Sequence, residues 1–305
     1  MRLPGFIRVL LKAVGVLVLV LVLAVGSVWT YFHPRLERTT GIVYGHRHER
    51  DLTLDIVHPA RPNGLGIVLL VSGGWKSSPG SFRSWMAAPL LRRGYTVFAA
   101  YHVPQPQATV MEIAEDMNRA IRFVRYHARE HGVDAKRLGV TGGSAGGHLG
   151  LLLATRGGSG PGDAADPVDR ESSAVQAVAI FYPVTDLLNL GKSTENLGDG
   201  GPPKSFVKAF GPNSTNLTIW KVIGRDLSPI YHVHSNLPPT LIYHGDADAL
   251  VPLDQSQRYQ TEARKLGQIV ELVIHAGGGH GWLSMLWDLR QFAKWFDRHL
   301  RPAGS

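Results

Sequence analysis

The 305-residue sequence predicts an α/β fold, a mostly parallel central sheet flanked by helices, behind one apolar helix at the N-terminus. Three observations lead to this prediction. Short apolar runs typical of buried strands alternate with stretches typical of helices. Residue types that carry chemistry follow directly after three of those runs, where open α/β sheets place their sites. An uncharged run of about 20 residues precedes them all.

The first element is the apolar run from 13 to 32, which is dominated by Val, Leu and Ala. The basic residues before it are Arg2, Arg8 and Lys12. A helix of about 20 residues spans the hydrocarbon core of a bilayer, and positive charges before it favour a cytoplasmic N-terminus. Residues 1–35 are therefore expected to be a membrane anchor, or a signal peptide if the small residues at 24–26 mark a cleavage site. Either way, residues 36–305 would form one domain outside the cytoplasm.

The elements of that domain are predicted from periodicity and apolar runs. Alternation indicates an antiparallel edge strand at 52–57. A buried strand is predicted at 241–243, and further strands are predicted at 66–71, 95–101, 138–140, 175–182 and 270–274. Helices are predicted at 110–130, 147–154 and 283–300. Two segments rich in Gly, Pro and Asp or Asn interrupt this order: 156–171 is expected to be an exposed loop, and 186–226 either a lid over the site or a peripheral excursion.

The most informative stretch is Thr-Gly-Gly-Ser-Ala-Gly-Gly at 141–147, between a predicted strand and a predicted helix. Strand, glycine-flanked serine and helix, in that order, are typical of a nucleophile elbow, in which a strained turn lifts the serine hydroxyl out of the sheet. The positions two before and two after the serine must lack bulk, and Gly142 and Gly146 meet that requirement. The sequence therefore predicts Ser144 as a nucleophile, with a plain glycine-rich turn as the alternative.

A serine nucleophile needs a base that takes its proton and a carboxylate that orients the base. Behind a nucleophile elbow these partners follow in the order acid, then histidine. The loop after strand 241–243 offers Asp246 and Asp248, and the loop after strand 270–274 offers His275 and His280. All four lie at carboxyl ends of predicted strands, so a Ser-Asp-His triad is expected there.

With these motifs the chain resembles the bacterial esterase and lipase branch of the α/β-hydrolases that includes acetyl-xylan and feruloyl esterases. The shared pattern covers roughly residues 50–300. Its motifs are Gly-Gly-Trp at 73–75, Gly-Gly-Ser-Ala-Gly-Gly-His-Leu at 142–149, Ser-Pro-Ile at 228–230, Pro-Pro-Thr at 238–240 and the loop from His244 to Pro252. The resemblance implies an α/β-hydrolase fold, Asp248 as the acid and His280 as the base. It also implies structural roles for Asp116 and His148.

The two rival residues have other expected roles. Asp246 is expected to shape its loop by accepting hydrogen bonds from local backbone N–H groups. His275 is expected to be a strand-terminal residue.

Backbone N–H groups must also stabilise the charge that develops on the carbonyl oxygen. One is expected from Ala145, the residue after the nucleophile. The others are expected from Gly73 and Gly74 in the loop after strand 66–71, with Ser72 as an alternative. Relatives usually carry a histidine at the head of this motif. This chain has none there, which leaves open which amides point inward.

The composition of the chain excludes several kinds of cofactor and binding partner. The chain has no cysteine, which excludes disulfides and thiolate-based metal or redox sites. No metal ion or organic cofactor is expected. The net charge is +8, but no dense block of Lys and Arg follows residue 50, so nucleic-acid binding is not expected.

Together these features predict a membrane-tethered or exported serine hydrolase that cleaves small-molecule or saccharide-linked carboxylic esters through an acyl-enzyme. Bulky rings near the oxyanion loop and the histidine are expected to fill the acyl side of the pocket and to favour acetyl or other short-chain esters. These rings are Trp75, Phe82, Trp85 and Trp282. The alternatives are a peptidase of the same fold and a catalytically silent binding protein on a hydrolase scaffold.

Overall fold

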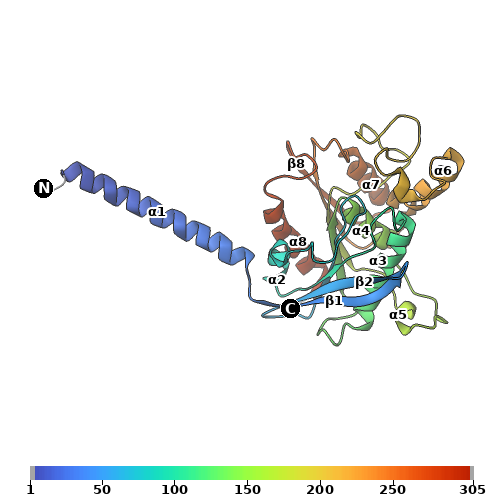
Figure 1. Ribbon diagram of the computed structural model, residues 1–305, viewed down its shortest axis with the longest axis horizontal. Helices are drawn as coiled ribbons and strands as arrows, with labels where there is room; N and C mark the ends of the chain where they lie inside the picture. The colour runs from blue at the N-terminus through green and yellow to red at the C-terminus, as the bar shows by residue number, and fades with distance from the viewer. Residues whose placement is uncertain (1–3, 303–305) are drawn as a thin grey trace.

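The computed structural model describes residues 4–302, so Arg2, one of the three basic residues before the apolar run, lies outside the described residues. Helix α1 (Gly5–Phe32) projects from a domain built on one eight-stranded sheet (Figure 1). The strands are β1 (Leu36–Arg47), β2 (Arg50–Pro59), β3 (Gly66–Leu70), β4 (Thr96–Ala100), β5 (Leu138–Gly143), β6 (Ala177–Phe181), β7 (Thr240–Gly245) and β8 (Val270–His275). The helices are α2 (Ala88–Leu91), α3 (Val110–Tyr126), α4 (Ala145–Arg156), α5 (Pro167–Arg170), α6 (Leu217–Asp226), α7 (Asp254–Lys265) and α8 (Met285–Leu300).

The sheet is mostly parallel, as predicted. Its order is β1-β2-β4-β3-β5-β6-β7-β8, and every pairing from β4 to β8 is parallel. Both faces are covered, because successive residues of β3 pack into different clusters: Val68 faces α3 and α4, and Ile67 faces α2 and α8. Burial on both faces explains why the inner strands are rich in apolar residues, whereas the edge strand β8 is buried only at Val270.

The antiparallel edge differs from the prediction. Strand β2 covers the predicted strand at 52–57 and is antiparallel to its neighbours, but β1 lies outside it and forms the edge. Only two of the twelve β1 residues are buried, and the register of the strand is interrupted twice, so its sequence shows neither a long apolar run nor regular alternation. Asp55 of β2 fixes this edge by accepting hydrogen bonds from the Arg38 side chain at 2.7 Å and from the N–H of Gly41 at 3.0 Å.

The predicted helices are present. Helix α3 begins at Val110 with a capping box, in which the Thr109 side chain accepts from the N–H of Glu112 and the Glu112 carboxylate accepts from the N–H of Thr109. It ends at Tyr126, four residues before the predicted end. Asp116 of α3 is buried and accepts hydrogen bonds from Arg47 of β1, a contact that ties the helix to the sheet edge.

Helix α1 is the one helix between residues 4 and 302 that is long and apolar enough to cross a membrane. Its most apolar window has a mean hydropathy of 2.8, and none of that window is buried against the domain. Only its last turn meets the domain, beside α2 and α8 (Figure 1). The two irregular segments also contain short helices: 156–171 includes α5, and 186–226 includes α6 and a 3₁₀ turn, η2 (Val207–Phe210).

Candidate active site

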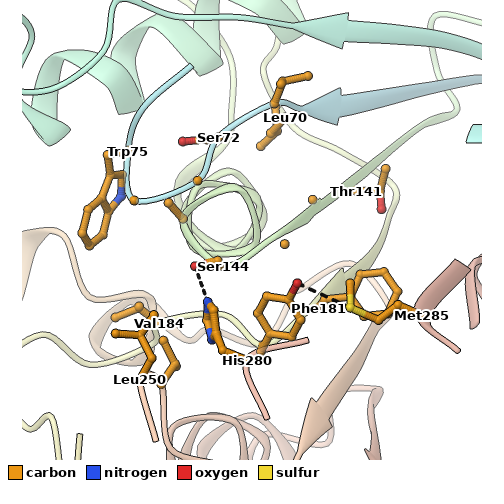
Figure 2. A pocket seen from close by; sticks show the side chains of 18 of the residues that line it. Leu70, Ser72, Trp75, Thr141, Ser144, Phe181, Val184, Leu250, His280 and Met285 are labelled. Carbon is orange, nitrogen blue, oxygen red and sulfur yellow. Dashed lines mark hydrogen bonds between the residues drawn. The ribbon is translucent and has the colours of Figure 1, made fainter. Parts of the chain in front are cut away.

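Ser144 lies in the tight turn between β5 and α4, with φ 54° and ψ −120°. The turn leaves no room for larger residues beside it. A Cβ on Gly142 would lie 2.7 Å from the backbone of Gly146, and a Cβ on Gly146 would lie 2.5 Å from the carbonyl oxygen of Leu70. A positive φ at a non-glycine residue is strained and is often found at functional sites. Figure 2 shows the side chain of Ser144 at the end of this helix, directed toward His280.

His280 connects Ser144 to Asp248. Its Nε2 lies 2.9 Å from the Ser144 Oγ, and its Nδ1 lies 2.7 Å from Oδ2 of Asp248. An ionised carboxylate can only accept, so Nδ1 carries the proton and donates a hydrogen bond to Asp248. Nε2 is then the unprotonated nitrogen and accepts the hydrogen bond of the serine hydroxyl. The fold therefore brings together the three residues that the sequence analysis named as nucleophile, base and acid.

Asp248 is buried and uses both carboxylate oxygens. Oδ2 faces His280, while Oδ1 accepts hydrogen bonds from the backbone N–H groups of Leu250 and Val251 at 3.0 and 2.9 Å. Burial alone would raise the pKa of this carboxyl. The hydrogen bonds from His244, His280 and the N–H of Val251 outweigh burial and hold the pKa well below its ordinary value. The carboxylate is therefore charged at neutral pH.

The two rival residues lie outside the relay, but Asp246 differs from its expected role because the backbone N–H that it binds belongs to another loop and not to its own. Asp246 is exposed, and its Oδ1 accepts the N–H of Gly277 at 2.7 Å, which links its loop to the loop after β8. The ring of His275 stacks on Trp282 with 4.7 Å between centroids. Neither residue contacts Ser144.

The loop after β3 makes a tight turn from Gly73 to Lys76. The N–H of each of these two residues donates to the carbonyl of the other at 3.0 Å, and Gly74 and Trp75 between them have φ of 55° and 54°. Positive φ at both central positions is the pattern of a type I′ turn. The strained Trp75 is buried, and its indole N–H donates to Nδ1 of His148 at 3.1 Å.

This turn corrects one of the expected oxyanion donors. The N–H of Gly73 is already bonded to Lys76, so it points into the turn. The carbonyl of Gly73 also points at Lys76. This carbonyl and the N–H of Gly74 belong to one trans peptide, in which the N–H and the C=O point in opposite directions. The N–H of Gly74 therefore points out of the turn. Among residues 4–302, neither this N–H nor that of Ala145 has an acceptor.

The turn is held against the first turn of α4. The carbonyl of Ser72 accepts the N–H of Gly146 at 3.1 Å, which joins the residue before the turn to the residue after Ala145. His148, buried on α4, donates from Nε2 to the carbonyl of Leu227 at 2.7 Å, so its Nδ1 is free to accept from Trp75. Burial lowers the pKa of His148 to about 4, which keeps it neutral in this structural role.

A second histidine supports the same turn and was not singled out from the sequence. Nε2 of His102, just past β4, lies 2.9 Å from the Ser72 hydroxyl, and its Nδ1 lies 2.8 Å from the carbonyl of Val103. A carbonyl can only accept, so Nδ1 donates and Nε2 accepts the hydroxyl of Ser72. The motif lacks the usual histidine at its head, but His102 reaches it from the neighbouring strand. The sequence carried no signal of this contact, because it joins residues 30 apart.

A cavity of about 550 Å³ opens beside Ser144, and its lining is mainly apolar. The segment 186–226 contributes Leu190, Ser193, Glu195, Pro203 and Phe206 to the lining. Trp75 and Phe82 line the cavity as expected, whereas Trp85 and Trp282 do not. Trp85 faces solvent with 39% of its surface exposed, and the indole of Trp282 packs on His275 and donates to Asp288.

Polar groups in the rest of the described chain do not suggest a metal centre. No group of three or more His, Asp or Glu side chains between residues 4 and 302 is placed to hold a metal ion.

Comparison with known proteins shows the family to which the chain belongs. The BD-FAE family model matches residues 54–262. Esterase LipQ of Mycobacterium tuberculosis is 33% identical over 59% of this chain and 42% of its own length. Isoprenylcysteine alpha-carbonyl methylesterase ICME of Arabidopsis thaliana is 24% identical over 83% of this chain and 58% of its own. The chain spans about half the length of the curated relatives it matches.

Solved structures share the fold. A truncated carbohydrate esterase from gut microbiota superimposes with a TM-score of 0.72 at 24% identity, covering 86% of this chain and 96% of that one. Esterase Est2 of Thermogutta terrifontis with propionate bound has a TM-score of 0.66 at 26% identity, covering 90% and 98%. The fold is therefore that of the α/β-hydrolases, as the sequence resemblance implied.

Proposed function

The chain belongs to the BD-FAE family, and from this premise we propose that it is a carboxylic ester hydrolase with Ser144 as its nucleophile. The observation that carries the proposal is the position of His280, hydrogen-bonded to Ser144 on one side and to Asp248 on the other. Relatives named as esterases support it.

In the proposed mechanism, the Oγ of Ser144 attacks the ester carbonyl while Nε2 of His280 takes its proton. The tetrahedral intermediate collapses as the same nitrogen returns that proton to the leaving alcohol oxygen. A water molecule then attacks the acyl-enzyme by the same route and releases the acid and free serine. Asp248, charged and buried, holds the ring with Nδ1 protonated and stabilises the imidazolium that forms twice in each turnover.

The oxyanion is stabilised in this proposal by the N–H groups of Gly74 and Ala145. Both are without an acceptor among the described residues, and both belong to segments that the Ser72–Gly146 hydrogen bond holds together. Backbone donors of this kind stabilise charge that develops only in the transition state, so they raise turnover rather than ground-state binding.

For the substrate, we propose a short acyl group on the serine and an apolar portion elsewhere in the ester. Trp75 and Phe206 pack together beside the turn from Gly73 to Lys76, which we call the oxyanion turn, and this packing leaves limited room there. Phe82 also lines the cavity. The cavity of about 550 Å³ is nevertheless larger than an acetyl ester needs, and its lining is mainly apolar. The propionate bound to the Thermogutta esterase is consistent with a short acyl group.

We further propose that residues 1–35 anchor the protein and that residues 36–305 form the catalytic domain outside the cytoplasm. The length and hydropathy of α1 support a membrane span, and Arg8 and Lys12 at its N-terminal end support this orientation.

The decisive experiment is labelling with a fluorophosphonate probe, which reacts with an activated serine. A Thermogutta esterase 27% identical to this chain has been phosphoramylated by tabun, so this class of reagent suits the fold. We expect wild type to be labelled and Ser144→Ala to be unlabelled, with turnover on p-nitrophenyl butyrate reduced about 10⁴-fold or more. Ser81→Ala is the matched control, because Ser81 lines the same cavity outside the hydrogen-bonded relay. An unlabelled wild type would favour a silent binding protein.

A further inference from the structure

The C-terminal turn of α1 is fixed to the domain next to the cavity wall. The Arg92 side chain, at the end of α2, donates to the backbone carbonyls of Thr30 and Tyr31. The rings of Tyr31 and Phe32 contact Trp287 of α8, with centroids 5.7 and 5.2 Å apart. These contacts show which face of the domain lies next to α1: it is the face where α2 and the start of α8 meet the end of this helix (Figure 1).

The connection at this face is short. Only residues 33–35 separate α1 from β1, and three residues span at most about 10 Å. If α1 crosses a bilayer, the face that carries Arg92 and Trp287 must therefore lie at the membrane surface. Aromatic residues mixed with basic ones are typical of the membrane–water interface. Here Tyr31 and Trp287 lie close to Arg92 and Arg290.

Large apolar side chains are exposed on the same part of the domain. Their exposed fractions are 39% for Trp85, 41% for Met86, 102% for Leu283 and 40% for Trp287. We call these four residues the apolar rim. Trp85 and Met86 belong to the 3₁₀ turn η1 (Ser84–Ala87), which packs against α2. Trp287 lies in the first turn of α8, which packs against α2 and meets the end of α1, and Leu283 lies two residues before α8. Clustered exposed apolar residues of this kind mark interaction sites, including membrane contacts.

The rim is the outer side of the cavity wall. Met86 belongs to both, since it lines the cavity and is exposed at the surface. Three residues of the same segment line the cavity: Met285, Leu286 and Leu289. Along the chain they are interspersed with Leu283 and Trp287, which belong to the rim. A molecule that enters beside Met86 therefore passes the rim before it reaches Ser144.

We propose that the apolar rim rests in the interface of the bilayer that α1 spans, and that the cavity takes its substrate from this bilayer. The substrate class is an amphiphilic ester whose hydrocarbon part occupies the apolar cavity while its ester group reaches Ser144. This inference rests on the proposed esterase function and anchor. Insertion of the rim into the interface removes apolar surface from water, the same effect that holds interfacial helices on membranes.

The position of the rim can be measured directly, because the chain has no cysteine of its own. The full-length protein is reconstituted in phosphatidylcholine vesicles that contain a lipid with a nitroxide quencher near the headgroup. A fluorophore is attached through Leu283→Cys or, as a matched control, through Val222→Cys. Val222 is 69% exposed on α6, on the opposite side of the domain from α1 (Figure 1). We expect quenching at position 283 and none at position 222. Equal fluorescence at both positions, with α1 inserted, would overturn the docking.

A kinetic test addresses the substrate. The rim variant Trp85→Asp/Leu283→Asp changes two residues that do not line the cavity, and Val222→Asp is its control. Each protein, in vesicles, is assayed with dissolved p-nitrophenyl acetate and with the acetate ester of 4-heptadecyl-7-hydroxycoumarin held in the vesicle membrane.

The expected result is a loss of about tenfold or more on the membrane-held ester for the rim variant only, since two apolar contacts with the interface are lost. The dissolved ester should be hydrolysed at the wild-type rate by all three proteins. A rim variant that keeps the wild-type rate on the membrane-held ester contradicts the proposal. A wild type inactive on the dissolved ester contradicts the esterase function instead, so the two failures are distinguishable.

Discussion

At the residue scale, the two carboxylate oxygens of Asp248 have different partners, and this explains why Asp248 and Asp246 differ in their expected effect on activity. One oxygen of Asp248 orients His280, and the other binds the backbone of its own loop. Asp246 binds only backbone, by accepting the N–H of Gly277. The two carboxylates are two positions apart in one loop, yet only one of them faces the imidazole.

We therefore predict different effects of two conservative substitutions. Asp248→Asn should lower kcat by about 10⁴, because an amide N–H facing Nδ1 favours the wrong tautomer. Asp246→Asn keeps an oxygen acceptor for Gly277 and should lower kcat less than about tenfold. Steady-state kinetics on p-nitrophenyl butyrate, with unfolding temperatures as a folding control, measure both. If Asp246→Asn were the more damaging, Asp248 would not be the acid.

His102 gives a second prediction at this scale, because it supports the oxyanion turn through Ser72 without reaching the substrate. His102→Ala should lower kcat about tenfold with little change in KM, since a shifted donor weakens transition-state stabilisation. Ser72→Ala should have a similar effect, and the double variant should be no worse than either single variant, because both remove one contact. Additive losses would mean that the two residues act separately.

The pKa of His102 adds a pH signature. Burial lowers this pKa to about 4, below the ordinary value of about 6.5. The unfolded chain therefore binds the proton first as pH falls, so the stability due to neutral His102 is complete above about pH 6.5 and is lost progressively toward pH 4. We expect His102→Gln to lose stability less steeply than wild type over that interval, measured by urea unfolding. Parallel curves would contradict this assignment.

These residues also show how far sequence reasoning reaches. Ser144 was predictable because its constraint is local: the surrounding glycines and the flanking strand and helix all lie within a few positions. Asp248 and His280 needed the resemblance in addition, since each loop offers two residues of the right type. His102, and the choice of Gly74 over Gly73, depend on contacts across strands and on which way a peptide faces. Neither leaves a pattern in the sequence.

At the scale of elements, the inner strands of the sheet could be predicted from the sequence, whereas the edge strand β1 could not. Strands β3 to β7 are buried on both faces, so most appear as apolar runs. Strand β8 forms the other edge and is buried only at Val270. Strand β1 has only two buried residues and is interrupted by irregular pairing, and it was not predicted. Its position beyond β2 comes from tertiary contacts such as that of Arg38 with Asp55.

The segment 186–226 supports a prediction about acyl length. Phe206 packs against Trp75 at 5.3 Å between centroids, and its ring would contact a Cβ on Gly74 at 3.0 Å, so it closes the cavity beside the oxyanion turn. Wild type should hydrolyse p-nitrophenyl butyrate with higher kcat/KM than decanoate. Phe206→Ala should raise the decanoate-to-butyrate ratio about tenfold, because each methylene accepted by a pocket changes discrimination by about 1–3 kcal/mol. Val207→Ala, a neighbour that does not line the cavity, is the control. An unchanged ratio would place the acyl chain elsewhere.

At the scale of the whole molecule, the arrangement of charge and hydropathy determines where the domain can work. Arg8 and Lys12 flank the N-terminal end of α1, while aromatic residues occupy its other end, next to the domain. In the proposed anchor, this asymmetry favours insertion with the basic end in the cytoplasm. The cavity, the candidate triad and the apolar rim would then all lie on the far side of the membrane.

We predict that protease added to spheroplasts of an expressing bacterium digests the domain without lysis, while a cytoplasmic marker enzyme stays intact. The reason is the positive charge of Arg8 and Lys12 at the N-terminal end of α1, which favours a cytoplasmic N-terminus. The matched variant Arg8→Glu/Lys12→Glu should therefore increase the fraction of the protein that is protected from the protease. N-terminal sequencing of the membrane fraction is the second readout. A sequence that begins at or before residue 12 shows that α1 is retained as the anchor, whereas one that begins near Ser27 shows a cleaved signal peptide. Full protection of wild type until lysis would reverse the topology, and with it the side of the membrane from which the cavity could receive an ester.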